Sequence, residues 1–412
     1  MSRVSHPPKV FMMDLWATVP YYTAYLSKAL LHEGLDLTVG SISYYLDPDC
    51  FRSRGIPLTP GVLDIVGKLS LPKLPRRLLK LGEATLNLLA LCVRFMLSRP
   101  DVIHVQYLPM LRWPLPLDWW FVSLCQSGGS KVVLTVHDLM PHDTADRHKS
   151  DFQALYRDVD AIICHSDHIA KRLQAEFNVS LSKIDVIAHG PFFYDLPAPA
   201  STAILQSFSL EGAKPLFLWQ GIIFPYKGID LLLDAWQAVE HELPEACLLI
   251  AGTGSPELLD QIRRQVNELH LQNVHLHMRF ITTEELVTLY RAADVVVYPY
   301  RAITTSGALA TGLALGKTIV ASNLPVFREL LTHQETALLV DPQNKQEFAS
   351  ALIRLGTDSA LRHQFASRIR DMQFGDQTWY SIAKRTIATY AEVLSGDTRP
   401  FSARHTDCPP TH

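Results

Sequence analysis

The strongest constraint on the fold is the regular alternation of short apolar runs with helical patterns along the chain. Nearly continuous apolar runs of this length are typical of strands that are covered on both faces. Helical patterns, such as those over 21–31 and 168–177, lie between them. The alternation predicts βα units and parallel sheets. The strands expected in the first half are KVFMMDL, LDLTVGSI, DVIHVQ, KVVLTVHD, AIICHS and IDVIAHG, which begin at Lys9, Leu35, Asp101, Lys131, Ala161 and Ile184.

The alternation starts again in the second half, so a second sheet is expected. A chain of 412 residues also exceeds what one hydrophobic core usually supports. We therefore expect two Rossmann-like α/β domains that face a cleft, with ligands beyond the carboxyl ends of the strands. The expected helices cover 228–241, 256–269, 283–292 and 307–315. The expected strands are PLFLWQG, ACLLIAGTG, NVHLHM, DVVVYPY, TIVASN and ALLVDP, which begin at Pro215, Ala246, Asn273, Asp294, Thr318 and Ala337.

A weakening of this pattern marks the domain boundaries. Pro197 and Pro199 lie where the alternation stops, which indicates a linker. A tail that contains three prolines follows the last helix and is expected to be disordered. The expected boundaries are 1–197 for the first domain, 198–213 for the linker, 214–377 for the second domain, 378–394 for a final helix and 395–412 for the disordered tail.

The composition argues against several classes of protein. A net charge of −3, without a tail rich in lysine or arginine, gives no general attraction to nucleic acid. The six cysteines are scattered and form no Cys-x-x-Cys pair. They indicate reduced thiols in a cytoplasmic protein, and neither a disulfide framework nor a zinc site. The segment Met1–Lys9 is polar and leads directly into a strand, so we expect no signal peptide.

One segment suggests contact with a membrane. Basic residues without an acidic neighbour precede Glu83, and the apolar run LNLLALCVRFML follows over 86–97. The stretch is too short and too charged to span a bilayer. It predicts a half-buried helix on a sheet with a solvated basic start, or a basic amphipathic surface that rests on anionic lipid. Both interpretations stay open, and each can hold for a different face. The candidate membrane-surface residues are Lys73, Arg76, Arg77 and Lys80.

The order and spacing of the motifs resemble the retaining glycosyltransferases of family 4, which have the GT-B fold. The resemblance extends from about Pro20 to Leu394. It implies transfer of a hexose from a nucleotide-diphosphosugar, UDP- or GDP-linked, to a hydroxyl group, without a metal or another cofactor. It also implies that the first domain binds the acceptor, that the second binds the nucleotide-sugar and that the final helix crosses back to the first domain. The motifs are DVIHVQ, VVLTVHDLMPHD, GIIFPYKGIDLLLDA, GTGSPELLDQI, ADVVVYPY and GKTIVAS.

Candidate diphosphate-binding residues lie in the second domain. Negative charge develops on the leaving phosphate, so hydrogen-bond donors held at that place accelerate the reaction. Ser306 and Gly307 begin a helix, where backbone N–H groups and the helix dipole favour an anion. Thr305 directly precedes them. Lys227 matches the family lysine that contacts the diphosphate, and its alternative is a solvated loop lysine.

His137 is the candidate catalytic residue. It follows a buried strand of the first half and matches the family histidine near the donor sugar. Because the leaving phosphate can accept the acceptor's proton, the histidine would position and stabilise groups without acting as a base. The alternative is a histidine that is satisfied by local hydrogen bonds at a strand end.

The sequence departs from the family at the donor site. The two family glutamates align with Ile303 and Thr311, and the family arginine aligns with Ile222 or Phe224. Other groups must therefore recognise the sugar and the ribose. For the two arginines among the candidates, a structural role on the surface stays open. The possible donor contacts are Gly221, Arg279, Arg301 and Glu329.

A metal site is not expected. His137, Asp138, His142 and Asp143 lie close together in the sequence, but the segment is a loop around Pro141 without helical spacing.

Three functions remain open. The first is a glycosyltransferase of surface polysaccharide or glycolipid assembly, cytoplasmic or peripheral on the inner face of the membrane, with a lipid-linked or saccharide acceptor. The second is a catalytically weak GT-B pseudo-enzyme or partner subunit that binds nucleotide or another glycosyltransferase. The third is an epimerase or a phosphorylase, although an epimerase is expected to keep carboxylates for proton transfer.

Overall fold

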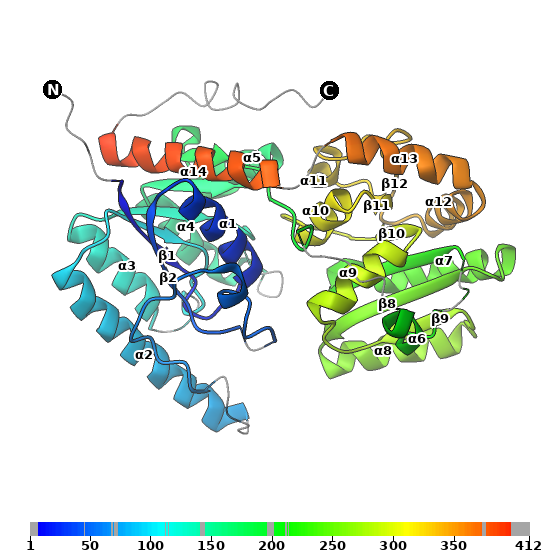
Figure 1. Ribbon diagram of the computed structural model, residues 1–412, viewed down its shortest axis with the longest axis horizontal. Coiled ribbons are helices and arrows are strands. Elements are labelled where there is room, and N and C mark those ends of the chain that lie inside the picture. Colours follow the sequence, from blue (N-terminus) through cyan, green and yellow to red (C-terminus); the bar gives the residue numbers. More distant parts are fainter. Residues whose placement is uncertain are drawn as a thin grey trace. The chain divides into compact units, whose positions relative to one another are not determined.

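The computed structural model describes residues 7–44, 46–66, 69, 73–111, 113, 115–140, 145–195, 202–210, 212, 214–372 and 376–396. The chain forms two compact units (Figure 1). Of the described residues, the first unit contains 7–188 and 379–396, and the second contains 189–378. The domain boundaries that the sequence suggests stay predictions, and 397–412 of the expected disordered tail lie outside the described residues.

The first unit is built on a parallel sheet with the strand order β2-β1-β3-β4-β5-β6. Its order reverses between β1 and β3, which is the place where open α/β sheets bind ligands. The strands are β1 (Lys9–Met13), β2 (Asp36–Gly40), β3 (Val102–Val105), β4 (Lys131–Thr135), β5 (Ala161–Cys164) and β6 (Ile184–Val186). The longer helices are α1 (Pro20–His32), α2 (Lys73–Leu97), α3 (Leu117–Ser127), α4 (Lys149–Asp158) and α5 (Asp167–Phe177).

The second unit has a parallel sheet of the same size, with the strand order β12-β11-β10-β7-β8-β9. The order reverses between β10 and β7. The strands are β7 (Leu216–Ile223), β8 (Cys247–Gly254), β9 (Val274–His277), β10 (Val295–Tyr298), β11 (Thr318–Ser322) and β12 (Ala337–Val340). The helices are α6 (Thr202–Ser207), α7 (Ile229–Glu242), α8 (Pro256–Glu268), α9 (Thr283–Ala292), α10 (Gly307–Ala314), α11 (Pro325–Arg328), α12 (Lys345–Thr357) and α13 (Ser359–Asp371).

Burial explains why the apolar runs form central strands. Every residue of β3 and of β10 is buried, as expected for strands with helices on both faces. In the second unit, α7, α8, α12 and α13 pack on the sheet around a hydrophobic core that includes Phe217, Trp236 and Leu352. The predicted fold class, two Rossmann-like parallel sheets, is confirmed.

The final helix, α14 (Asp376–Ser395), packs on the first unit from Trp379 onward. The ring of Trp379 stacks on Tyr25 of α1, with the ring centroids 5.6 Å apart. The Tyr390 hydroxyl lies 2.6 Å from Nδ1 of His104 in β3. These contacts join the end of the chain to the first sheet, so the predicted crossover helix is confirmed.

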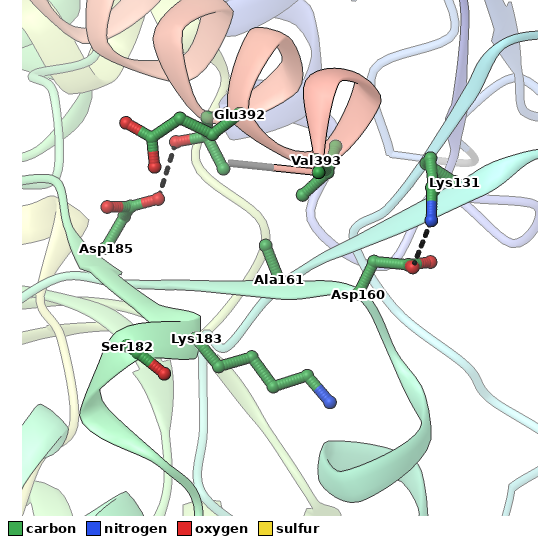
Figure 2. A pocket seen from close by; sticks show the side chains of 10 residues that line it. Lys131, Asp160, Ala161, Ser182, Lys183, Asp185, Glu392 and Val393 are labelled. Carbon is green, nitrogen blue, oxygen red and sulfur yellow. Dashed lines mark hydrogen bonds and ion pairs between the residues drawn. The ribbon is translucent and has the colours of Figure 1, made fainter. Parts of the chain in front are cut away.

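A mixed-charge hollow of about 160 Å³ lies at the amino ends of β4, β5 and β6 (Figure 2). Lys131 and Asp160 form an ion pair of 3.1 Å on one side of it. On the other side, Thr389 of α14 donates a hydrogen bond of 2.8 Å to Asp185. This hollow is at the edge of the sheet opposite the carboxyl ends, and its polar groups help to hold α14 in place.

Candidate functional site

His137 lies at the carboxyl edge of the first sheet, two residues after β4, and is 8% exposed. Its Nε2 atom is 3.0 Å from Oε1 of Gln106, which follows β3 directly. An amide oxygen accepts hydrogen bonds, so Nε2 of His137 carries the proton. The imidazole is therefore oriented by a residue from the neighbouring strand.

Aromatic rings support this imidazole. The ring of Tyr22 in α1 lies 4.7 Å from that of His137 and 5.2 Å from that of His165. The ring of Trp379 also contacts Tyr22, with the ring centroids 5.5 Å apart. Helix α14 thus contributes to the surroundings of the catalytic candidate, through Tyr22.

His165 follows β5 and is held neutral. Burial lowers its pKa to about 4. Its Nδ1 atom lies 2.9 Å from the carbonyl oxygen of Ile187, so Nδ1 donates to that oxygen. A neutral imidazole beside His137 adds no positive charge near pH 7.

Sequence reasoning missed several residues of this edge. Gln106, Tyr22 and His165 lie at or near strand ends or at a helix start, but nothing in the spacing links them to His137. Asp14, just after β1, was missed as well. It accepts hydrogen bonds from the backbone N–H groups of Thr18 and Val19, at 2.7 and 3.1 Å. The available signal is the polar residue after each apolar run, Asp14 in KVFMMDL and Gln106 in DVIHVQ.

Lys227 lies in the second unit, in the short turn η5 (Pro225–Lys227) that follows β7. Its Nζ donates a hydrogen bond of 3.0 Å to the hydroxyl of Tyr300, and it lies 4.2 Å from the centre of that ring. Tyr300 is completely buried just after β10. Lys227 is thereby held at the reversal point between β7 and β10, where ligands of such sheets bind.

The turn after β7 requires a glycine at Gly228. Its φ is +66°, and a Cβ atom there would lie 1.8 Å from the carbonyl oxygen of Pro299. Arg301 holds the same turn through a bidentate ion pair with Asp230, at 2.7 and 2.6 Å. Its backbone N–H also donates to the carbonyl oxygen of Tyr226, at 2.8 Å. Arg301 supports the position of Lys227, and its role as a donor contact stays a prediction.

Arg279 also has a carboxylate partner. It makes a bidentate pair with Glu285, at 2.9 and 2.7 Å, and these hydrogen bonds lower the pKa of Glu285 to about 2. Glu285 completes the capping box at the start of α9 together with Thr282. Arg279 therefore takes part in helix capping, and its contact with a donor stays a prediction.

The start of α10 combines a cap with a close contact. The hydroxyl of Ser306 accepts a hydrogen bond of 3.1 Å from the backbone N–H of Leu309. A Cβ atom at Gly307 would lie 2.6 Å from the ring of Phe192 and 3.3 Å from that of His189. The close approach that glycine permits is made here by two side chains of the same unit. Thr305 is partly buried beside them.

Thr311, which the resemblance aligns with a family glutamate, is 2% exposed. Its hydroxyl donates to the carbonyl oxygen of Gly307 at 2.8 Å and accepts from the backbone N–H of Phe192 at 3.2 Å. The hydroxyl thus joins α10 to the segment that precedes it. The Thr311 hydroxyl is therefore engaged by two partners within the protein.

The remaining donor candidates lie at other places of the second unit. Gly221 is in β7, where a Cβ atom on its neighbour Gly252 would lie 1.9 Å from the Gly221 oxygen. Glu329 is exposed at the end of α11. Ile222 and Phe224, where the family arginine would stand, are about half exposed. No charged side chain has replaced the arginine at these two positions.

The basic start of α2 is partly described. The amine of Lys80 lies 6.0 Å from the ring of Trp16, in the loop after β1. The side chains of Lys73, Arg76 and Arg77 lie outside the described residues. Among the described residues, no group of three or more histidine, cysteine or acidic side chains could hold a metal ion, and His142 and Asp143 lie outside them.

Two family models match the chain, one in each unit. The model "Glycosyltransferase Family 4" matches residues 19–190, and "Glycosyl transferases group 1" matches residues 201–372. The chain belongs to glycosyltransferase family 4. The resemblance in the motifs is thereby confirmed for most of the chain, and with it membership of a family of retaining glycosyltransferases.

Two curated relatives are similar to this glycosyltransferase over part of their length. An uncharacterized glycosyltransferase of Methanocaldococcus jannaschii is 24% identical over 256 residues, which cover 61% of this chain and 65% of that protein. The phosphatidyl-myo-inositol mannosyltransferase of Mycobacterium tuberculosis is 33% identical over 207 residues, which cover 48% and 52%. The matches thus span about half to two thirds of these relatives.

A solved structure confirms the GT-B fold of the glycosyltransferase. The Anabaena protein HepE, solved in complex with UDP-glucose, matches 95% of this chain and 100% of its own with a TM-score of 0.69 and 17% identity. At this identity the likeness shows the fold. The roles of the individual site residues stay predictions.

Proposed function

We propose that the protein transfers a hexose, with retention, from a UDP- or GDP-linked sugar to a hydroxyl group of a lipid-linked or saccharide acceptor. The observation that carries the proposal is the position of Lys227. Its amine is held by Tyr300 at the reversal point of the second sheet, beyond the carboxyl ends of the strands. A cation at this place suits the diphosphate of a nucleotide-sugar.

The chemistry requires stabilisation of the leaving group. The bond between the anomeric carbon and the diphosphate oxygen breaks, and the acceptor oxygen bonds to the same face of the sugar. The acceptor's proton passes to the leaving phosphate. Lys227 would stabilise the charge of that phosphate, and the backbone N–H groups at the start of α10, with Thr305, Ser306 and Gly307, would add donors.

His137 acts in the first unit in this proposal. Gln106 and Tyr22 hold its ring in one orientation, which reduces the entropy lost when the reacting groups are brought together. Because His165 is neutral, it adds no positive charge at this edge. His137 would contact the donor sugar and position it, while the leaving phosphate acts as the base.

The sugar and the ribose must be recognised without the family glutamates. Thr311 bonds within the protein, and Ile303 has no polar side-chain atom. Backbone groups and the candidates Gly221, Arg279, Arg301 and Glu329 remain for this role. The UDP-glucose in HepE supports UDP as the nucleotide, without naming the sugar for this chain.

A lipid-linked acceptor is supported by the surroundings of the first sheet's carboxyl edge. Trp16 follows β1 and packs edge-on against Trp113, with the ring centroids 5.7 Å apart. Lys80, from the basic start of α2, lies over Trp16. Tryptophan and lysine together are typical of surfaces at the water–lipid boundary. The mannosyltransferase relative is named for a phosphatidyl-inositol acceptor.

We place the protein in surface polysaccharide or glycolipid assembly, on the inner face of the membrane. Across the described ranges, no helix is both long and apolar enough to cross a bilayer. The proposal therefore requires peripheral attachment.

A screen of the full chain with nucleotides and nucleotide-sugars tests the function. A ligand at 100 times its dissociation constant should raise the free energy of unfolding by about 2.7 kcal/mol, which a thermal shift detects. With the stabilising sugar donor, nucleotide release should require an acceptor, and NMR of the product should show the anomeric configuration of the donor. Product with inverted configuration would contradict the proposal.

A nucleotide-binding pseudo-enzyme is the second candidate, because Ile303 and Thr311 replace both family glutamates. It predicts stabilisation by nucleotide without nucleotide-sugar consumption in the presence of any acceptor extract. The same assay therefore separates the two functions.

A further inference from the structure

Helix α2 is apolar on two opposite faces. Its inner face packs on the protein: Phe95 contacts Phe11 of β1 at 4.9 Å and Phe121 of α3 at 5.7 Å, and Leu88 and Leu91 are buried. A second apolar set lies on the other side and is exposed. It consists of Leu78, Leu79, Leu86, Leu89, Val93, Met96 and Leu97.

The exposed set forms one continuous strip. Leu86, Leu89 and Val93 follow the spacing of a single helix face and are 55%, 57% and 59% exposed. At 100° per residue, the seven side chains fall within roughly a third of the helix circumference, and no charged residue of α2 falls among them. A helix of 25 residues is about 37 Å long. Monomeric proteins rarely expose an apolar surface of this extent without a function.

The neighbouring helix α3 also exposes apolar side chains. Helix α3 packs beside α2 at the rim of the first unit (Figure 1). Trp120 and Leu124 lie one turn apart on α3 and are 51% and 59% exposed. Tryptophan prefers the boundary between water and acyl chains, because its ring is apolar and its N–H is polar.

The charged residues near the strip indicate what kind of surface it contacts. Between residues 65 and 100 the chain has seven basic residues and one acidic residue, Glu83. The Glu83 carboxylate is held by hydrogen bonds from the backbone N–H groups of Ile65 and Val66, at 2.7 and 3.0 Å. A flat apolar strip within a strongly basic segment is complementary to anionic headgroups above acyl chains.

We infer that the outer face of α2 and α3 inserts into the surface of an anionic lipid leaflet, with the helix axes parallel to the membrane plane. The apolar strip, and not the basic residues alone, then provides the attachment. This inference rests on the peripheral attachment in the proposed function and names the surface that provides it. Flotation needs neither donor nor acceptor, so its failure is distinguishable from a failure of sugar transfer.

Flotation with vesicles tests the insertion. The parent should float with vesicles of phosphatidylglycerol and phosphatidylcholine, and the triple variant L86Q/L89Q/V93Q should partition at least about tenfold less. The variant leaves the net charge unchanged, so its loss reports apolar contact. The control L394Q alters an exposed leucine of α14 and should float like the parent. Equal flotation of the parent and the triple variant overturns the inference.

Salt separates insertion from electrostatic adsorption. At about 1 M NaCl, where the screening length is roughly 3 Å, an inserted protein stays bound and an adsorbed one is released. The variant R76Q/R77Q should weaken binding at low salt by about tenfold or more, because two basic residues are lost. Complete release of the parent by salt contradicts insertion.

Quenching by brominated lipid reports the depth of Trp120. Parent fluorescence should fall when the acyl chains carry bromine, and W120F should lose part of that quenching. If the parent and W120F are quenched to the same extent, the assignment of Trp120 to the lipid-facing strip is wrong.

Sedimentation without vesicles detects a competing occupant. A parent dimer that L86Q/L89Q/V93Q dissociates, with no flotation of the parent, assigns the strip to a second copy of the chain and overturns the inference. The triple variant should keep the thermal midpoint of the parent, because the three side chains are more than half exposed. If the triple variant does not fold, the flotation assay is repeated with the single variant L89Q.

Discussion

The amine of Lys227 lies 3.0 Å from the hydroxyl of Tyr300, although 73 positions separate the two residues in the chain. The strands before them, β7 and β10, are neighbours in the sheet, and the order of strands reverses between them. The buried ring of Tyr300 gives the lysine a fixed place, and the phenol leaves the amine with donors for a second partner.

We expect Lys227→Ala to lower kcat/KM about tenfold to a hundredfold. This range corresponds to roughly 1.5–3 kcal/mol for a hydrogen bond to a charged group. The penalty should be near the upper end, because the positions of the family arginine hold Ile222 or Phe224. Calorimetric titration should show weaker binding of the nucleoside diphosphate and unchanged binding of the nucleoside.

Tyr300→Phe is the matched control for this prediction. It removes the hydroxyl and keeps the ring beneath the amine, so the effect should be smaller than that of K227A. If K227A binds the diphosphate as tightly as the parent, Lys227 has no phosphate role.

His137→Ala should reduce turnover by about a hundredfold or more, which is the usual range for a group that acts at the reaction centre. The free energy of unfolding should fall by roughly 1–3 kcal/mol, because Gln106 loses its buried partner. Steady-state kinetics and circular dichroism measure the two effects. The exposed His241→Ala should change neither. A purified H137A with parental turnover would show that the assignment is wrong.

Gly307→Val should act in two separable ways. A Cβ atom at this position meets Phe192 at 2.6 Å, so overpacking should cost about 1–3 kcal/mol of stability. The added side chain should also hinder approach of a phosphate to the backbone N–H groups of α10.

The double variant G307V/F192A distinguishes the two effects. Removal of the Phe192 ring should restore the thermal midpoint, while kcat/KM stays low. Recovery of both quantities would mean that Gly307 serves packing alone.

His104 should make the stability of the first unit depend on pH. Burial lowers its pKa to about 3, from 6.5 in the unfolded chain. Between these values the unfolded chain binds a proton that the folded chain does not, so this contribution is complete above pH 6.5 and is lost as the pH falls toward 3. Asp14 acts in the opposite direction, because burial raises its pKa to about 6.

A comparison of the parent with His104→Gln isolates the contribution of His104 to the pH dependence of the free energy of unfolding. The free energy of unfolding of the parent should fall by about 2 kcal/mol relative to that of His104→Gln when the pH is lowered from 6.5 to 5. Each pKa unit corresponds to about 1.4 kcal/mol. Urea unfolding of the first unit at several pH values measures it. A difference that is constant with pH would exclude a neutral buried His104.

The strands and the fold class could be predicted because the apolar pattern that marks a buried strand lies within a few consecutive residues. A strand with helices on both faces must be apolar along its length, and β3 and β10 show this in four residues each. The helix start at Ser306 could also be predicted from local sequence. Its hydroxyl caps α10 by accepting a hydrogen bond from the backbone N–H of Leu309, three residues later. His137 and Lys227 are predicted as single residues from the family resemblance, and the structure places each shortly after a strand.

The partners of these residues were decided by the tertiary structure. Gln106 meets His137, and Tyr300 meets Lys227, because parallel strands bring their carboxyl ends to one edge whatever the distance along the chain. Apolar periodicity does not specify strand order. Helix α2 shows the same limit: Leu88 and Leu89 are equally apolar in the sequence, but one packs inward and the other is exposed. Which side of a helix is covered depends on the neighbours that the whole fold supplies.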